Sequence, residues 1–344
     1  MTATRAIDTI GRDVGHALGA FALGVVLLAG FLWAAGFDIS GALTALWQGA
    51  FGSWYALTST TLVHATPLLL LGLAFTVGAR AGALNIGMEG QFAAGAVAAV
   101  AVGVHAGTLP AIVAIPLVLG AGLIAGAAWI AVPVILRARF EITEVISTLL
   151  LNFVATAAVS YAVTGPLQEP SRIYPQSAPI ARAARLPHFG AGSRLHAGFP
   201  IALLIAALLM IVFHRTRWGF RLRAVGSGAR AAEIAGGIAT TRVVAMALLW
   251  SGAIAGLGGA VEVSGVSYAL FQNLSPGYGF TAIAVALLGR MRPALVVVAA
   301  IMFGALEAGS GAMQRDAAIP AVGIQVVEGV VIVAALIVAW RRPR

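Results

Sequence analysis

Ten apolar runs, spread along the whole chain, constrain what this sequence can fold into. A helix crosses the hydrocarbon core of a membrane with about 20 consecutive apolar residues. Of the 344 residues, 60% are apolar and 10% are charged, whereas about a quarter of a soluble domain is charged. The sequence therefore predicts an all-α polytopic membrane protein of about ten transmembrane helices. The runs are Ala17–Gly36, Thr61–Ala79, Ile86–Val104, Pro110–Leu136, Thr143–Val163, His196–Phe213, Val243–Val261, Phe280–Leu288, Ala294–Gly309 and Ala321–Trp340.

Two of these runs depart from the simplest pattern. Ala17–Gly36 is as long as a full span, and a signal peptide has a shorter apolar core, so we expect an uncleaved first span. Phe280–Leu288 is too short to cross alone. It either extends backward through Ser275-Pro276-Gly277 or forms a broken helix, which is tolerated where it faces protein or a watery cavity.

The runs and the polar segments between them predict one membrane domain over residues 1–344. Its expected parts are a first span and a connection (1–60), a first core half (61–163), an external loop (165–195), a cytoplasmic loop (214–242) and a second core half (243–340). Residues 37–60 contain Gly and Trp and are expected to form a partly interfacial connection.

Arginine placement predicts the orientation, because positive residues accumulate on the cytoplasmic side. With ten crossings and a cytoplasmic N-terminus, 16 arginines lie inside and 5 lie outside. We therefore expect a multi-pass protein of the bacterial inner membrane with both termini in the cytoplasm. The net charge of +9 is then explained without nucleic acid.

Missing residue types exclude several chemistries. All 21 basic residues are arginine, so the chain lacks the lysine with which a phosphate-binding loop reaches its nucleotide. There is no cysteine, which removes thiol nucleophiles and cysteine–zinc sites. No catalytic motif, acid/base pair or metal-ligand spacing is present, so no enzyme site, metal or resident cofactor is expected.

A polar stripe runs along the segment that follows Arg139. Its members recur every four residues and so lie along one side of a helix. Inside a membrane such a stripe faces other helices or water. Two interpretations stay open: hydrogen bonds between helices, or the lining of a solute pathway. The members are Glu144, Thr148, Asn152, Thr156 and Ser160.

A second polar group opens the third run, in the stretch Asn85-Ile86-Gly87-Met88-Glu89-Gly90-Gln91. A carboxylate at membrane depth is costly unless it is paired or hydrated. Glu89 is therefore either a structural ion pair, with Arg80 as the expected partner, or a functional gate. Small residues such as Gly95 and Gly256 belong to rows that allow close helix packing.

The segment His214–Arg242 carries six arginines. Residues Arg230–Ala235 are expected to form a short helix closed by glycine. The segment is either an ordinary basic loop beside anionic lipid or a docking helix for a cytoplasmic partner.

Four stretches of the chain form a recognisable set of motifs: Ala83–Phe92 (ALNIGMEGQF), Glu144–Asn152 (EVISTLLLN), Arg223–Gly236 (RAVGSGARAAEIAG) and Ser275–Arg290 (SPGYGFTAIAVALLGR). Together they resemble the permease subunits of bacterial ABC importers, in the superfamily of ribose and branched-chain amino acid permeases. The nucleoside-type branch is the most similar. The motifs run in family order from about residue 60 to the C-terminus. One departure is that the acid follows the alanines in Ala231–Gly237, unlike the Glu-Ala-Ala-Gly loop of other importer permeases.

The resemblance implies a translocation subunit of about ten helices in two related halves. Its partners would be a second related permease, two cytoplasmic ATPase subunits that bind the ATP, and an extracytoplasmic solute-binding protein. Ala231–Gly237 would be the coupling segment, with Arg230, Ala231, Ala232, Glu233, Gly236 and Gly237 as coupling residues. From the polar residues we expect the pathway to involve Asn85, Glu89, Gln91, Glu144, Thr148, Asn152 and Tyr278.

Neutral amides and hydroxyls suit a nucleoside or a similar small polar solute, and Tyr278 or Phe280 could stack on a base. A sugar or branched-chain amino acid permease is the alternative within this class. An ion-coupled secondary transporter is the alternative of another class, with Glu89, Glu144 or Glu262 as its titrating group. A membrane enzyme and a purely structural subunit are further alternatives.

Overall fold

The computed structural model describes residues 25–320 apart from Ala191, together with positions 15, 19, 22, 329 and 333. This part of the chain is helical and contains no strand, with only three isolated β-bridges, all of them in or beside residues 165–197. The expected all-α class is confirmed for the described residues. The last expected run, Ala321–Trp340, lies outside them apart from positions 329 and 333.

Six helices are long and apolar enough to cross a membrane. They are the continuous helical stretch Trp54–Arg80, which contains α3 (Trp54–Ala56), a π-helical turn and α4 (Leu62–Arg80); α6 (Ala111–Phe140); α7 (Glu144–Thr164); α8 (Gly198–Arg215); Thr240–Ser267, which contains α11 (Thr240–Glu262) and a second π-helical turn; and α13 (Pro293–Asp316).

Three shorter apolar helices complete the set: Val25–Ala34, α5 (Met88–Gly103) and α12 (Tyr278–Leu288). At 1.5 Å per residue, the 11 residues of α12 reach about 16 Å, roughly half of a 30 Å hydrocarbon core. The helix begins directly after Gly277, so the expected backward extension through Ser275-Pro276-Gly277 is wrong. The broken helix is the form that the structure shows.

Most of the connection expected over residues 37–60 is helical. Asp38 accepts hydrogen bonds from the backbone N–H groups of Ser40 and Gly41. It thereby caps α2 (Ile39–Phe51), and Ser53 caps α3 in the same way. These capping side chains satisfy N–H groups that a helix start leaves open. α2 packs along α13.

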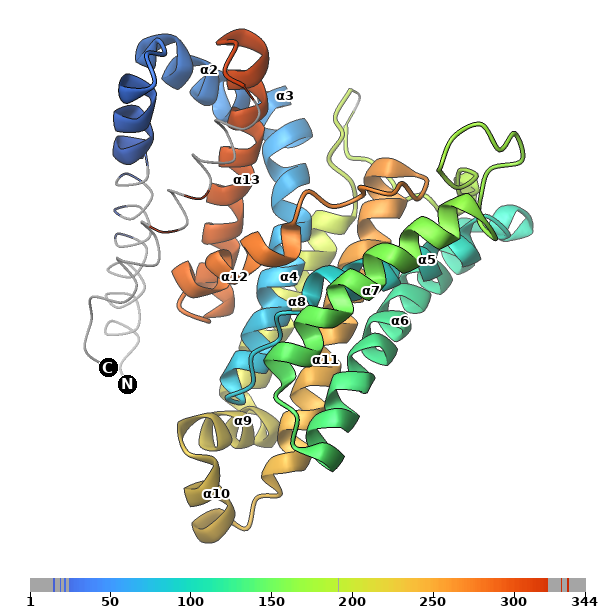
Figure 1. Cartoon of the computed structure of the whole chain (residues 1–344), viewed down its shortest axis with the longest axis vertical. Helices are drawn as coiled ribbons and strands as arrows, with labels where there is room; N and C mark the ends of the chain where they lie inside the picture. The colour runs from blue at the N-terminus through green and yellow to red at the C-terminus, as the bar shows by residue number, and fades with distance from the viewer. Residues whose placement is uncertain are drawn as a thin grey trace.

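The interior of the fold is formed by α4, α5 and α11, with α6, α12 and α13 packed around them (Figure 1). α11 crosses α5 and α6 through glycines. A Cβ added at Gly95 or Gly126 would collide with the backbone of Gly256. The expected close packing of these small residues is confirmed, and it lets three helices approach to backbone contact.

Two further helices lie at the end of the fold where α4, α8 and α6 finish (Figure 1). They are α9 (Arg217–Ser227) and α10 (Ala229–Gly236). Arginines concentrate at this end. Of the 16 arginines in the described part of the chain, 11 lie on this side. The other 5 lie on the opposite side, which holds the loop between α7 and α8 and the end of α13. The charge asymmetry expected from the sequence is present in the described part of the chain.

A buried histidine in the loop before α8 predicts a pH dependence of stability. His196, which precedes the membrane helix, is 1% exposed, and its Nδ1 accepts from the N–H of Gly198 at 3.1 Å. Burial, with the nearby charges of His188 and Arg194, lowers the pKa of His196 to about 4. The neutral form is therefore favoured in the folded state. Neutral His196 thus contributes to the free energy of unfolding, on the order of 3 kcal/mol. This contribution is present above pH 6.5 and is lost as the pH falls toward 4.

We expect the melting temperature in detergent to drop between pH 7.5 and pH 5, and His196→Gln to show a smaller drop. His105→Gln, at an exposed histidine, should retain the wild-type drop. An unchanged pH profile in His196→Gln would contradict this assignment.

Candidate functional site

Two short helices begin inside the fold, and their N-termini meet. α5 begins at Met88 after the non-helical stretch 81–87, and α12 begins at Tyr278 after the non-helical stretch 268–277. Oε2 of Glu89, in the first turn of α5, accepts a hydrogen bond from the backbone N–H of Gly279 at 2.7 Å. A carboxylate is stabilised at a helix N-terminus by the open N–H groups there. Glu89 therefore joins the two helix starts.

Ser275 completes the start of α12. Its Oγ accepts from the N–H groups of Gly277 and Tyr278 at 3.1 and 3.0 Å. Gly277 has φ of +102°, a conformation that favours glycine. The sharp turn at this residue lets the chain enter α12 without a preceding helical turn.

A small polar cavity lies beside this junction, with a volume of about 110 Å³. Its walls come from α5, α7 and the stretch before α12, and Phe92 and Leu274 supply apolar surface. Pockets for small molecules are typically about 300–1,000 Å³, so this space is smaller than a whole nucleoside requires. The polar lining residues are Glu89, Asn152, Thr156, Gln272, Asn273 and Ser275.

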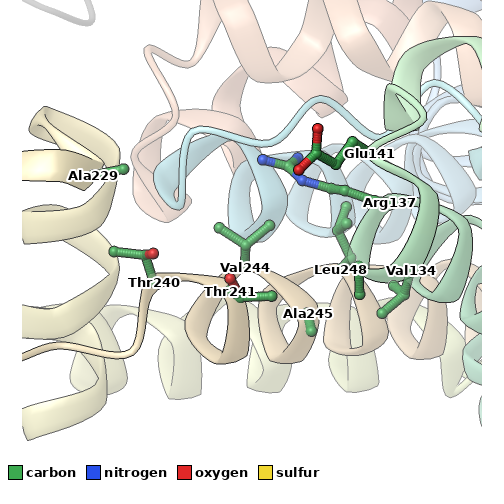
Figure 2. Close-up of a pocket in the computed structure, with 10 residues that line it drawn as sticks. Val134, Arg137, Glu141, Ala229, Thr240, Thr241, Val244, Ala245 and Leu248 are labelled. Atoms are coloured by element: carbon green, nitrogen blue, oxygen red, sulfur yellow. The ribbon is translucent and has the colours of Figure 1, made fainter. Parts of the chain in front are cut away.

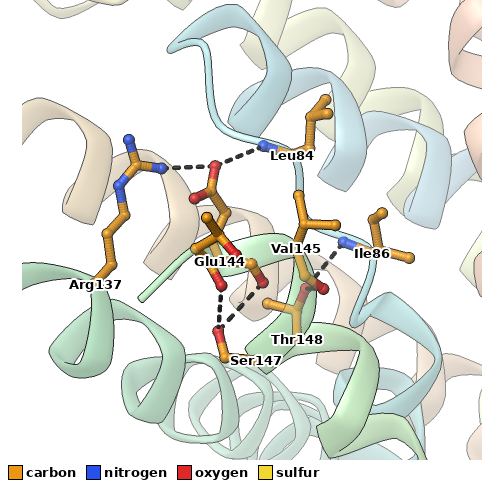
Figure 3. A network of polar contacts seen from close by, with 8 residues as sticks. Leu84, Ile86, Arg137, Glu144, Val145, Ser147 and Thr148 are labelled. Carbon is orange, nitrogen blue, oxygen red and sulfur yellow. Dashed lines mark hydrogen bonds and ion pairs between the residues drawn. The ribbon is translucent and has the colours of Figure 1, made fainter. Parts of the chain in front are cut away.

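The polar stripe of α7 holds the non-helical stretch before α5 (Figure 3). Glu144 forms an ion pair of 2.6 Å with Arg137 and accepts from the N–H of Leu84 at 3.3 Å. The N–H of Ile86 donates to Oγ1 of Thr148 at 3.3 Å. These contacts favour the hydrogen-bonding interpretation for the first two members of the stripe.

The later members of the stripe reach the cavity. Asn152 donates from Nδ2 to the carbonyl of Ile86 at 3.0 Å and accepts at Oδ1 from the N–H of Gly90 at 2.8 Å. Asn152 and Thr156 also line the cavity, and Ser160 accepts from Gln272 at 3.1 Å. One stripe therefore packs helices at one end and borders a polar space at the other.

Asn85 and Gln91 form a closed network away from the cavity. The two amides bond each other reciprocally at 2.8 and 2.9 Å, and Asn85 also donates to Oγ of Ser251 at 2.8 Å. Both side chains are buried. Since their polar atoms are satisfied, the network fixes the bend before α5 against α11.

Tyr278 lies at the start of α12 with its hydroxyl 3.2 Å from Nδ1 of His64. Its ring meets Phe92, a cavity residue, edge to face with centroids 6.2 Å apart. Tyr278 is thus one layer behind the cavity wall. Phe280, the other aromatic candidate, is 48% exposed.

The expected ion pair between Arg80 and Glu89 is wrong. Nε of Arg80 donates to the carbonyl of Met291 at 3.0 Å, and its guanidinium carbon lies 4.4 Å from the ring centroid of Phe213. The physical reason is the stretch 81–87, in which seven non-helical residues can span up to about 23 Å. Arg80 and Glu89, although close in sequence, therefore lie at different levels of the helix bundle.

The expected short helix of the arginine-rich segment is confirmed as α10. Gly237 closes it with φ of +57°, and its N–H donates to the carbonyl of Glu233 at 3.1 Å. Ala232 is buried, whereas Arg230, Ala231, Glu233 and Gly236 are exposed. A pocket of about 250 Å³ separates the start of α10 from the end of α6, and Figure 2 shows Arg137 and Glu141 on one side of it and Thr240 and Thr241 on the other.

Sequence reasoning missed Gln272, Asn273 and Ser275. The available signal was a cluster of polar residues directly before an apolar run too short to cross a membrane.

Comparison with known proteins gives one family match. The model of the branched-chain amino acid transport system / permease component family matches residues 57–339. The glucose ABC transporter permease protein TsgB13 of Haloferax volcanii is 36% identical over 94% of this chain and 86% of its own length. The guanosine ABC transporter permease protein NupP of Bacillus subtilis is 36% identical over 91% and 90%. The nucleoside ABC transporter permease protein NupB of Lactococcus lactis is 30% identical over 91% and 86%. In each organism a second permease protein also matches, at 30%, 28% and 24% identity respectively.

Proposed function

We propose a solute for this member of the family of branched-chain amino acid transport system permease components: a nucleoside or a similar small polar solute, carried inward across the bacterial inner membrane. Membership of the family makes the chain a membrane permease subunit of an ABC transporter. The observation that carries the proposal is the polar cavity at the meeting point of two broken helices. Transporter sites commonly lie where discontinuous helices meet near the membrane midplane.

The composition of the cavity supports a neutral solute. Amides and hydroxyls from Asn152, Thr156, Gln272 and Asn273 border it, and these groups can both donate and accept hydrogen bonds. Phe92 supplies aromatic surface. Guanosine and nucleoside permeases are among the relatives. A glucose permease is equally similar, so a sugar remains the alternative solute.

We further propose that the core consists of two halves with opposite direction. In the first, α4 runs toward the α9–α10 end, and residues 81–87 turn back into α5. In the second, α11 runs away from that end, and residues 268–277 turn back into α12 (Figure 1). Each half thus contains a long helix, a non-helical return and a short helix. The arginine-rich end would face the cytoplasm, with both termini on that side.

ATP hydrolysis by partner subunits would act through α10. This helix continues into α11 through residues 237–239, and α11 packs on α4, α5 and α6. The pocket of about 250 Å³ beside α10 leaves room for movement. The Arg137–Glu144 ion pair joins the end of α6 to the start of α7. Glu144 also accepts a hydrogen bond from the N–H of Leu84, in the stretch before α5. That stretch leads to Glu89. The second matching permease in each of three organisms supports a pair of unlike permeases, supplied with solute by a binding protein.

A charge reversal on α10 tests the coupling. Glu233→Arg is expected to reduce co-purification of the ATPase subunits in mild detergent, because it reverses an exposed charge on the docking helix. Arg172→Glu, an exposed reversal in the loop between α7 and α8, is the matched control and should leave co-purification unchanged. Equal loss in both variants would contradict the assignment of α10.

Uptake assays test the energy source and the solute. Uptake of labelled guanosine should stop when ATP is depleted with the ion gradients maintained. Uptake that continues until the gradients collapse would favour a secondary transporter. Preferential competition by glucose would assign a sugar.

A further inference from the structure

Three arginines converge on an open pocket at the α9–α10 end of the fold. The pocket has a volume of about 690 Å³ and lies between α9, α10 and the first turns of α11. Arg217 and Arg221 come from α9, and Arg242 comes from α11. None of the described residues that line the pocket carries a carboxylate. Within the described chain, these three guanidinium groups form no ion pair or hydrogen bond. The pocket is therefore a site of uncompensated positive charge.

The depth of the pocket indicates which anion it meets. α8, which is long and apolar enough to cross a membrane, ends at Arg215, and α9 begins two residues later. Arg242 is in the first turn of α11, which belongs to another such helix. All three arginines therefore lie where membrane helices end, which is the level of the lipid headgroups. Phe220, between Arg217 and Arg221 along α9, is 60% exposed. Basic residues flanking an exposed aromatic on an amphipathic helix are typical of helices that lie in the membrane interface.

The rest of the lining is apolar. It includes Ala224, Ala235, Ile238 and Val243. A soluble anion would gain nothing from this surface. The glycerol backbone and first acyl carbons of a lipid would bury apolar area against it.

We propose that this pocket binds the phosphate of an anionic phospholipid of the cytoplasmic leaflet through Arg217, Arg221 and Arg242. Guanidinium groups form bidentate hydrogen bonds to phosphate. Three uncompensated positive charges also disfavour the cationic group of a zwitterionic headgroup, and so select an anionic lipid. The bound lipid braces α10 from the side of α9. That consequence for transport rests on the proposed function of α10, whereas the binding does not.

The test measures lipid retention by the purified full chain in native mass spectrometry, with phosphatidylglycerol and phosphatidylcholine supplied in equal amounts. The wild type should prefer phosphatidylglycerol by about tenfold or more. The variant R217Q/R221Q/R242Q should lose this preference, and the corresponding lysine variant should retain part of it. The control R139Q/R172Q/R182Q removes the same charge outside the pocket and should retain the full preference.

Three results would overturn the proposal: undiminished preference in R217Q/R221Q/R242Q, an equal loss in the control, or displacement of the lipid by equimolar inorganic phosphate. Capture of ATPase subunits by the same variants is a separate readout. If lipid preference is absent while capture is normal, the lipid site is wrong and the role of α10 stands.

Discussion

Glu89→Ala is expected to reduce uptake by about 10- to 100-fold, because a hydrogen bond to a charged group typically contributes about 1.5–3 kcal/mol and each 1.4 kcal/mol is a factor of ten. The substitution removes the acceptor of the Gly279 N–H and the one carboxylate among the described residues of the cavity. The starts of α5 and α12 then lose their direct link. Uptake of labelled guanosine, normalised to the amount of protein in the membrane, is the measurement.

Two variants separate the possible roles of this carboxylate. Glu89→Gln keeps an oxygen acceptor and removes the charge, so it should retain more uptake than Glu89→Ala if the link between helices matters most. Glu307→Gln, at a half-buried carboxylate of α13 outside the cavity, should remain near wild type. Full uptake by Glu89→Ala would exclude Glu89 from the working site.

Gly256→Val is expected to prevent formation of the folded core. The position faces the backbone of Gly122 and Gly126 on α6, and a Cβ would lie within collision distance of both. Overpacking typically costs about 1–3 kcal/mol where side chains can adjust. Here the neighbouring atoms belong to helix backbone, so a whole helix would have to shift, and we expect a larger loss of stability. The yield of monodisperse protein on size exclusion should fall severely.

Gly120→Val is the matched control. It places the same side chain on α6 at a glycine with open space around it. A normal yield from Gly120→Val together with loss of Gly256→Val would assign the defect to the helix crossing. Equal yields from both would show that the crossing tolerates separation.

Hydropathy located the helices because a segment that crosses lipid must be both long and predominantly apolar, and must satisfy its own backbone hydrogen bonds as a helix does. Every expected run within the described residues contains a helix. Hydropathy could not show where the helix over residues 39–51 begins, since that start is fixed by the capping side chain of Asp38. It also left open how Phe280–Leu288 crosses, because the start of α12 depends on the turn at Gly277 and on contacts with Ser275 and Glu89.

The candidate site was partly predictable for a related reason. The four-residue spacing placed Glu144, Thr148 and Asn152 on one side of α7, but it could not tell which of them packs against the bend and which borders the cavity. The predicted partner of Glu89 was wrong because it was chosen by closeness along the sequence. In the fold, the non-helical stretch between Arg80 and Glu89 separates them, and each has another partner. The role of the polar residues before α12 could not be predicted from the sequence, because it depends on the fold that places them beside α7.

The head-to-head arrangement of α5 and α12 has an electrical consequence. Both helices direct the positive ends of their dipoles toward the cavity, and Glu89 is engaged by the backbone of α12. The two helix ends carry roughly +0.5 elementary charge each, and the carboxylate of Glu89, which lies between them, offsets both. With the local charge close to zero, we expect the cavity to favour an uncharged solute over ions of either sign.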